Sequence, residues 1–81
     1  MTDKARLLWD FRGPAAAQTA AHHVIHLNEF FERESFTCYE TGVLKQSPMW
    51  QSAYAIVDLT DAQALREILK PHRGQRIAEG S

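Results

Sequence analysis

The 81-residue sequence contains a single cysteine, Cys38, so an internal disulfide bond is excluded. Structural disulfides belong to oxidising compartments, and we therefore expect this chain in a reducing one, with the cytoplasm as the default. No apolar run approaches the roughly 20 residues that span a bilayer. Charged residues interrupt the first apolar stretch too early for a secretory signal. The sequence thus predicts neither a membrane protein nor a membrane partner.

An excess of charge of one sign is also lacking. Nine Lys and Arg residues against ten Asp and Glu residues give a formal net charge of −1. This balance provides no general attraction to nucleic acid, whose partners are usually basic. No glycine-rich phosphate loop, Ser-His-Asp order, paired-carboxylate pattern or RNA-binding aromatic motif is recognisable. We expect no cofactor and no nucleic-acid partner, and the sequence leaves open whether the protein is an enzyme.

The residues that are present indicate one small globular domain, with 44% hydrophobic and 23% charged residues. Gly13 and Pro14 are typical of a helix start, and Thr60 with Gln63 forms a capping-box pattern at a second one. Apolar periodicity predicts three strands and two helices. Their order is a strand at 5–11, a helix at 14–33, strands at 35–42 and 51–59, and a helix at 60–70.

The remaining segments are less regular. Residues 43–50 contain Ser47 and Pro48 and predict a hairpin loop longer than a tight turn. Residues 72–81 form a polar tail whose end we expect to fray. Within it, residues 75–79 contain a single large apolar side chain, Ile77, so a fourth strand is predicted to be weak or absent.

The order of elements resembles the ferredoxin-like plait, a two-layer α+β fold of βαββα(β) order with both helices on one face of a small antiparallel or mixed sheet. The resemblance covers residues 5–70 and rests on topology. A right-handed crossover predicts the first strand parallel beside the third, with the second outside. The first strand would then form an uncovered sheet edge.

Strand alternation predicts what each sheet face carries. Ala53, Ala55 and Val57 are small enough for close helix packing, so Tyr54 and Tyr39 are expected on the opposite, open face. An apolar open face on a small domain predicts a partner, and a homodimer is the simplest one. We expect a binding or interaction module that dimerises through this face or an edge strand, with its ligand or partner surface formed by Tyr39, Tyr54, Trp50, Met49, His23 and Phe30.

An alternative interpretation is a small-molecule-binding protein or enzyme of the dimeric plait type, with a pocket at the open face. Asp10, His23 or Tyr54 would then handle protons. The basic run near the end of the chain is a candidate anion site formed by Lys70, His72, Arg73 and Arg76. The simpler interpretation of that run is solvated positive charge that interacts favourably with the dipole at the C-terminal end of a helix.

The segment HHVIHLNEFF (22–31) places His22 and His26 one helical turn apart, on the face opposite Val24. Such a pair can chelate a transition metal, and Glu29 could add an oxygen ligand. Structural and catalytic zinc sites usually use at least three protein ligands. Metal binding through this pair is therefore our third interpretation, beside the simpler one of a solvated helix face.

Overall fold

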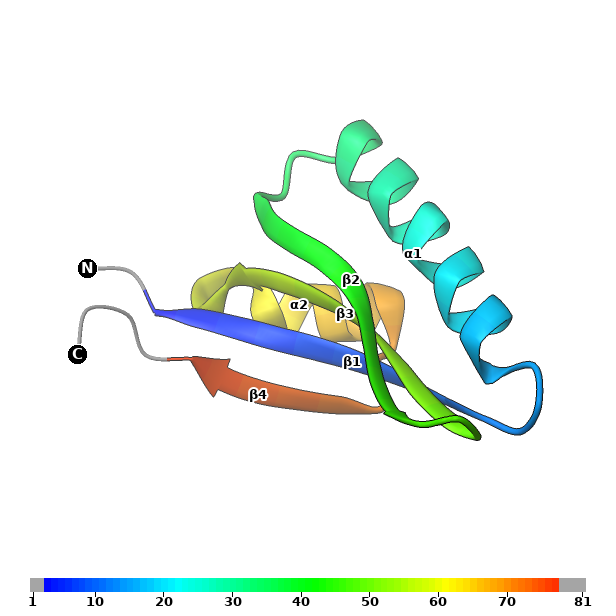
Figure 1. Ribbon diagram of the computed structural model, residues 1–81. Helices are drawn as coiled ribbons and strands as arrows, with labels where there is room; N and C mark the ends of the chain where they lie inside the picture. The colour runs from blue at the N-terminus through cyan, green and yellow to red at the C-terminus, as the bar shows by residue number, and fades with distance from the viewer. Residues whose placement is uncertain (1–2, 78–81) are drawn as a thin grey trace.

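The computed structural model describes residues 3–77 and contains four strands and two helices in that range (Figure 1). The strands are hydrogen-bonded in the order β2-β3-β1-β4, and all neighbours are antiparallel. The protein is thus an α+β domain with an antiparallel sheet. Its elements are β1 (Lys4–Arg12), α1 (Ala16–Arg33), β2 (Cys38–Ser47), β3 (Trp50–Asp58), α2 (Leu59–Leu69) and β4 (Arg73–Ile77).

The direction of the central strand pair differs from our prediction. β1 and β3 are antiparallel, with Leu8 opposite Tyr54, so the predicted parallel pair was wrong. The crossover through α1 makes β2 run in the same direction as β1, and the β2–β3 hairpin then reverses the chain. β3 therefore enters the sheet between them in the opposite direction. The crossover rule applies to β1 and β2, which are not neighbours.

A fourth strand is present, contrary to the prediction of a weak or absent one. β4 pairs with β1 from Arg73 opposite Leu8 to Ile77 opposite Lys4, and it covers the edge of β1. Residues 78–79 of the predicted segment lie outside the described residues. The hydrophobic pattern missed β4 because backbone hydrogen bonds hold an edge strand without requiring alternating apolar side chains.

The β2–β3 hairpin is longer and tighter than predicted. β2 begins at Cys38 rather than residue 35 and extends to Ser47, and a two-residue turn at Pro48–Met49 replaces the predicted longer loop. Register shifts near both ends of β2 accommodate its irregular pattern. Gly42 lies against the ring of Tyr54, where an added Cβ would come within 2.8 Å of the phenol oxygen. Glycine is therefore required at this close approach.

The predicted helix caps were wrong. α1 begins at Ala16, and Gly13 instead forms the preceding turn, with φ of 106° and its N–H donated to the Met49 carbonyl at 2.8 Å. α2 begins at Leu59, so the Thr60–Gln63 capping box does not form. Asp58 precedes α2, and its carboxylate accepts a hydrogen bond from Tyr39. Long-range contacts therefore override the local capping pattern.

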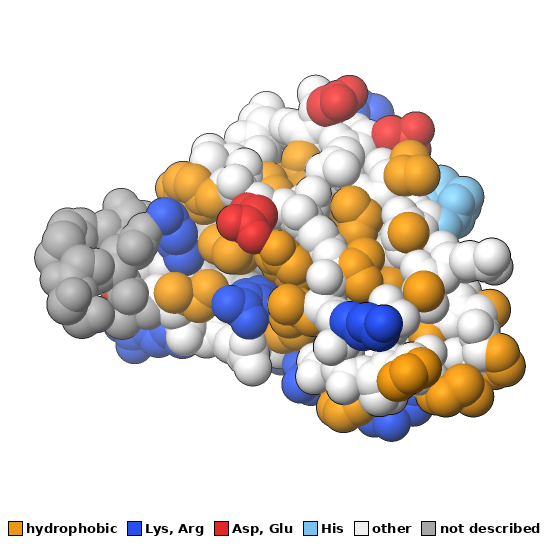
Figure 2. Space-filling view, viewed as in Figure 1, with side chains coloured by type: hydrophobic (Ala, Val, Ile, Leu, Met, Phe, Trp, Pro, Cys, Tyr) orange, Lys and Arg blue, Asp and Glu red, His pale blue; other side chains and the backbone are white. Residues whose placement is uncertain are grey.

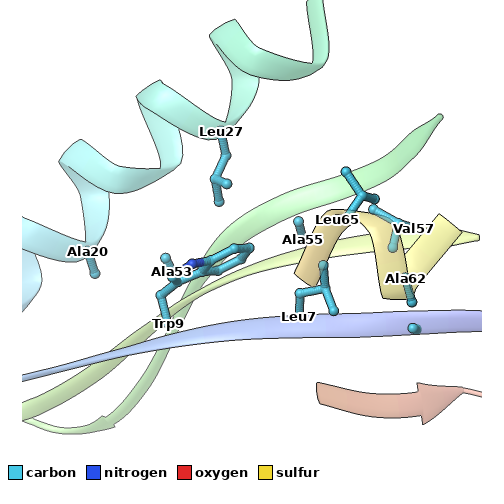
Figure 3. Close-up of a cluster of buried hydrophobic side chains, with 10 residues drawn as sticks. Leu7, Trp9, Ala20, Leu27, Ala53, Ala55, Val57, Ala62 and Leu65 are labelled. Carbon is cyan, nitrogen blue, oxygen red and sulfur yellow. The ribbon is translucent and has the colours of Figure 1, made fainter. Parts of the chain in front are cut away.

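Both helices pack on the same face of the sheet, where they contact β1 and β3 (Figure 3). Ala53, Ala55 and Val57 are fully buried there, which confirms the predicted alternation of β3. Their small side chains leave room for Leu27 of α1 and Leu65 of α2. The opposite face of the sheet has no helix over it within residues 3–77.

A candidate binding surface on the open sheet face

The open face is defined here as the side of the sheet opposite the helices, and it is more polar than predicted. Leu8 is buried and Ile56 half-buried there, but charged and aromatic side chains surround them. Figure 2 shows Lys and Arg side chains among hydrophobic ones over the strands. Among residues 3–77, the charged residues of this face are Lys4, Arg6, Arg12 and Arg73 with Asp10, Glu40 and Asp58, and its aromatic residues are Tyr39, Trp50 and Tyr54.

Asp10 is the centre of a hydrogen-bond network that joins β1, β3 and β4. Arg73 donates to both carboxylate oxygens of Asp10, at 2.8 and 2.9 Å. Ser52 donates to the same carboxylate at 2.5 Å, and the indole N–H of Trp50 lies 3.3 Å away. Burial raises the pKa of Asp10, but these hydrogen bonds and the Arg73 charge outweigh it and lower the pKa to about 2. Asp10 is therefore a fixed negative charge at neutral pH.

Each aromatic ring of the open face has a cation over it. The guanidinium carbon of Arg12 lies 4.4 Å from the Trp50 ring centre. That of Arg6 lies 5.7 Å from the Tyr54 ring centre. At the opposite end of β1 from Arg12, the Lys4 ammonium lies 4.2 Å from the centre of the Tyr39 ring. These cation–π contacts hold the rings and the cations in defined orientations.

The two tyrosines also donate hydrogen bonds to carboxylates. Tyr54 donates to Glu40 and Tyr39 donates to Asp58. The hydrogen bond to Glu40, burial and the Glu40 charge raise the pKa of Tyr54, against a smaller lowering by Arg6. Tyr54 thus keeps its proton at neutral pH and acts as a donor.

The predicted surface residues fall into two groups. Tyr39, Tyr54 and Trp50 lie together on the open face, and Met49 is exposed in the turn before Trp50. Phe30 lies on the helix side of the sheet, where it stacks on Phe36 at a ring distance of 6.2 Å.

His23 also lies on the helix side, between Trp9 and Phe11, with ring distances of 4.9 and 5.6 Å. Its Nε2 is buried and has no hydrogen-bond partner among the described residues. Desolvation lowers the pKa of His23, and the charges of the neighbouring histidines lower it further. The three residues of the enzyme hypothesis are therefore not brought together, because Asp10 and Tyr54 lie on the open face and His23 does not.

The position of His23 leads to a pH prediction. The unfolded chain has an ordinary histidine pKa of 6.5, and the folded value is lower. Below about pH 6.5 the unfolded state takes up a proton that the folded state resists, so the free energy of unfolding should fall as the pH falls. Urea denaturation between about pH 8 and pH 5 measures this slope. His23→Phe should flatten this slope most, and the exposed His22→Gln, which removes only the smallest of the charge effects on His23, should flatten it less. Equal slopes in all three proteins would contradict the prediction.

The four residues of the candidate anion site are spread over the end of α2 and β4. Lys70 ends α2 with a left-handed backbone, and Arg76 donates to the Asp3 carboxylate. Of these four residues, only His72 and Arg73 contact the same third residue, Asp10. The N–H of Asp10 donates to His72 Nδ1 at 2.7 Å, and Arg73 donates to the Asp10 carboxylate. The basic run thus supplies partners to Asp10 rather than a separate cluster.

The candidate metal ligands lie on the exposed side of α1. The Nε2 atoms of His22 and His26 are 2.9 Å apart, and a Glu29 oxygen lies 3.5 Å from His26 Nδ1. Within residues 3–77, no group of three or more His, Cys, Asp or Glu side chains could hold a metal ion. Cys38 is half-buried, and desolvation raises its pKa more than backbone hydrogen bonds at Glu40 and Ile56 lower it.

Comparisons of this chain with protein-family models, curated proteins and solved structures gave no match. Neither helix between residues 3 and 77 has the length and apolar character that a membrane span requires. The candidate site is the open face, because cation–π contacts and the hydrogen bonds of Asp10 hold its aromatic and charged side chains together.

Proposed function

We propose that the protein is a small binding module of ferredoxin-like topology that acts as a cytoplasmic homodimer, with the open faces of two copies packed against each other. The observation that supports the dimer is the arrangement of charged and aromatic side chains on β1 and β3. The strand order β2-β3-β1-β4 with both helices on one face supports the ferredoxin-like assignment. The single half-buried cysteine is compatible with a reducing compartment.

The open face is complementary to itself. In a dimer whose two-fold axis runs along the strands, β1 of one copy lies over β3 of the other, so residues paired within one sheet also meet across the interface. β1 and β3 pair Lys4 with Asp58, which are of opposite charge. They also pair Arg12 with Trp50, a cation with an aromatic ring. Both pairs would be favourable when repeated between the copies.

The residue types of this face are those that contribute most to protein interfaces. Trp, Tyr and Arg are enriched among the residues whose truncation weakens binding most. Trp50 and Tyr54 are already fixed by contacts with Arg12 and Arg6, so little side-chain freedom would be lost on association. A domain of this size also buries only about 60% of its unfolded surface, so a second copy would add to its stability.

Light scattering at tens of micromolar protein tests the dimer, which should have twice the 9.2 kDa mass of one chain. Ile56→Lys places an ammonium group on the open face and should give the mass of one chain. Ile25→Lys changes an isoleucine that is 55% exposed on α1 and should keep the dimer. Far-UV circular dichroism confirms that both variants are folded. A wild-type mass of 9.2 kDa, or a dimer that only Ile25→Lys disrupts, would contradict the proposal.

A further inference from the structure

We propose that His22 and His26 form a binding site for a divalent transition metal, with Cu²⁺ preferred and Ni²⁺ next. The site is independent of the proposed dimer, because it lies on the exposed side of α1 and not on the open face. Figure 2 shows histidine side chains in pale blue at the molecular surface.

The two ring nitrogens are spaced as two adjacent ligands of one metal ion would be. The Nε2 atoms of His22 and His26 are 2.9 Å apart. Imidazole nitrogens bind such metals at about 2.0–2.1 Å. Two of them at 90° to each other are then about 2.9 Å apart, whereas a tetrahedral angle requires about 3.3 Å. The observed spacing matches two adjacent positions of a square-planar or octahedral metal, the geometries that Cu²⁺ and Ni²⁺ adopt with nitrogen ligands.

Glu29 has a different part in this site from the one that the sequence suggested. Its carboxylate lies 3.5 Å from Nδ1 of His26, the ring nitrogen that does not face His22. A carboxylate at Nδ1 favours a proton there, and the lone pair of His26 is then on Nε2, toward His22. Glu29 is therefore a positioning residue rather than a third ligand.

The backbone already holds the two ligands in place. α1 runs from Ala16 to Arg33, and residues four apart lie one above the other on a helix. The imidazole rings are nearly perpendicular, at 82°, with their centres 4.5 Å apart. Without a metal, the short contact requires one proton shared between the two Nε2 atoms. A metal would replace that proton, with water at its remaining coordination positions.

Isothermal calorimetry of the metal-free full-length protein with Cu²⁺ and Ni²⁺ tests the site. We expect one ion per chain, tighter for Cu²⁺, and nitrogen hyperfine structure from two imidazoles in the Cu²⁺ electron paramagnetic resonance spectrum. His22→Ala and His26→Ala should each abolish this binding. Both residues are exposed, and circular dichroism checks the fold.

Glu29→Gln should weaken Cu²⁺ binding about tenfold by removing the carboxylate at Nδ1, while the matched change Glu32→Gln on the same helix should leave it unchanged. An equal weakening by both changes would indicate a general charge effect and would overturn the positioning role. Absence of binding in the wild type, or equal binding in the wild type and His26→Ala, would overturn the site itself.

Discussion

Replacing Asp10 with asparagine is expected to lower the free energy of unfolding at neutral pH by about 2 kcal/mol. The side chain of Asp10 is only 17% exposed, and its carboxylate accepts hydrogen bonds from Arg73, Ser52 and Trp50. The amide keeps the shape of the carboxylate but removes the charge that compensates Arg73. Loss of one partner leaves the other polar groups under-satisfied, which costs more than the net contribution of an ordinary hydrogen bond.

The same residue sets an acid dependence. The unfolded carboxyl has a pKa of 3.8 and the folded one of about 2. The stabilisation is therefore complete above about pH 4 and is lost as the pH falls toward about pH 2, because the unfolded state takes up the proton first. Urea denaturation at pH 7 and near pH 3 should show a larger difference between wild type and Asp10→Asn at the higher pH.

Two further variants separate this network from a general loss of negative charge. Glu67→Gln removes an exposed carboxylate of α2 and should change the free energy of unfolding by less than about 0.5 kcal/mol. Arg73→Gln, combined with Asp10→Asn in a double-mutant cycle, should show that the two losses are not additive. Additive losses, or an equal effect of Glu67→Gln, would mean that the Asp10–Arg73 pair does not contribute as its geometry indicates.

Those features of the fold that depend on a local sequence pattern, such as the buried face of a strand, were predictable from the sequence. Alternation placed Ala53, Ala55 and Val57 toward the helices, and all three are fully buried there. Strand direction and β4 were not predictable in this way. Direction depends on which strands become neighbours, and β4 is held by backbone pairing that its side chains do not reveal.

In the candidate site, too, the residues whose position depends on one strand were predictable, and those that depend on long-range contacts were not. Strand alternation predicted Tyr39 and Tyr54 on the open face, since each depends only on its own strand. The Asp10 network was not predicted, because Ser52 and Arg73 are 42 and 63 residues away from Asp10 in the sequence. No spacing rule links such distant residues.

Truncation of Leu65 to alanine is expected to have the largest effect on stability, a loss of about 3 kcal/mol. The buried residues of α2 in the described chain are Ala62 and Leu65, and the Leu65 side chain is 0% exposed. The truncation leaves a cavity between α2 and the sheet that rigid neighbours cannot fill. A domain of this length has a free energy of unfolding of roughly 4–12 kcal/mol, so the variant should lose a large part of its stability.

The matched control is Ile68→Ala on the same helix, where the isoleucine is 52% exposed. We expect a change within about 0.5 kcal/mol, since little apolar surface returns to water. Equal losses of stability from the two truncations in thermal and urea denaturation would contradict the packing of Leu65 against the sheet.

The Leu65→Ala variant can also be used to test the proposed dimer. Leu65 lies on the helix side, so the variant should retain the open-face interface, and association should raise its unfolding midpoint as protein concentration increases. A midpoint that does not depend on concentration, in either the wild type or Leu65→Ala, would indicate that the folded chain stays monomeric.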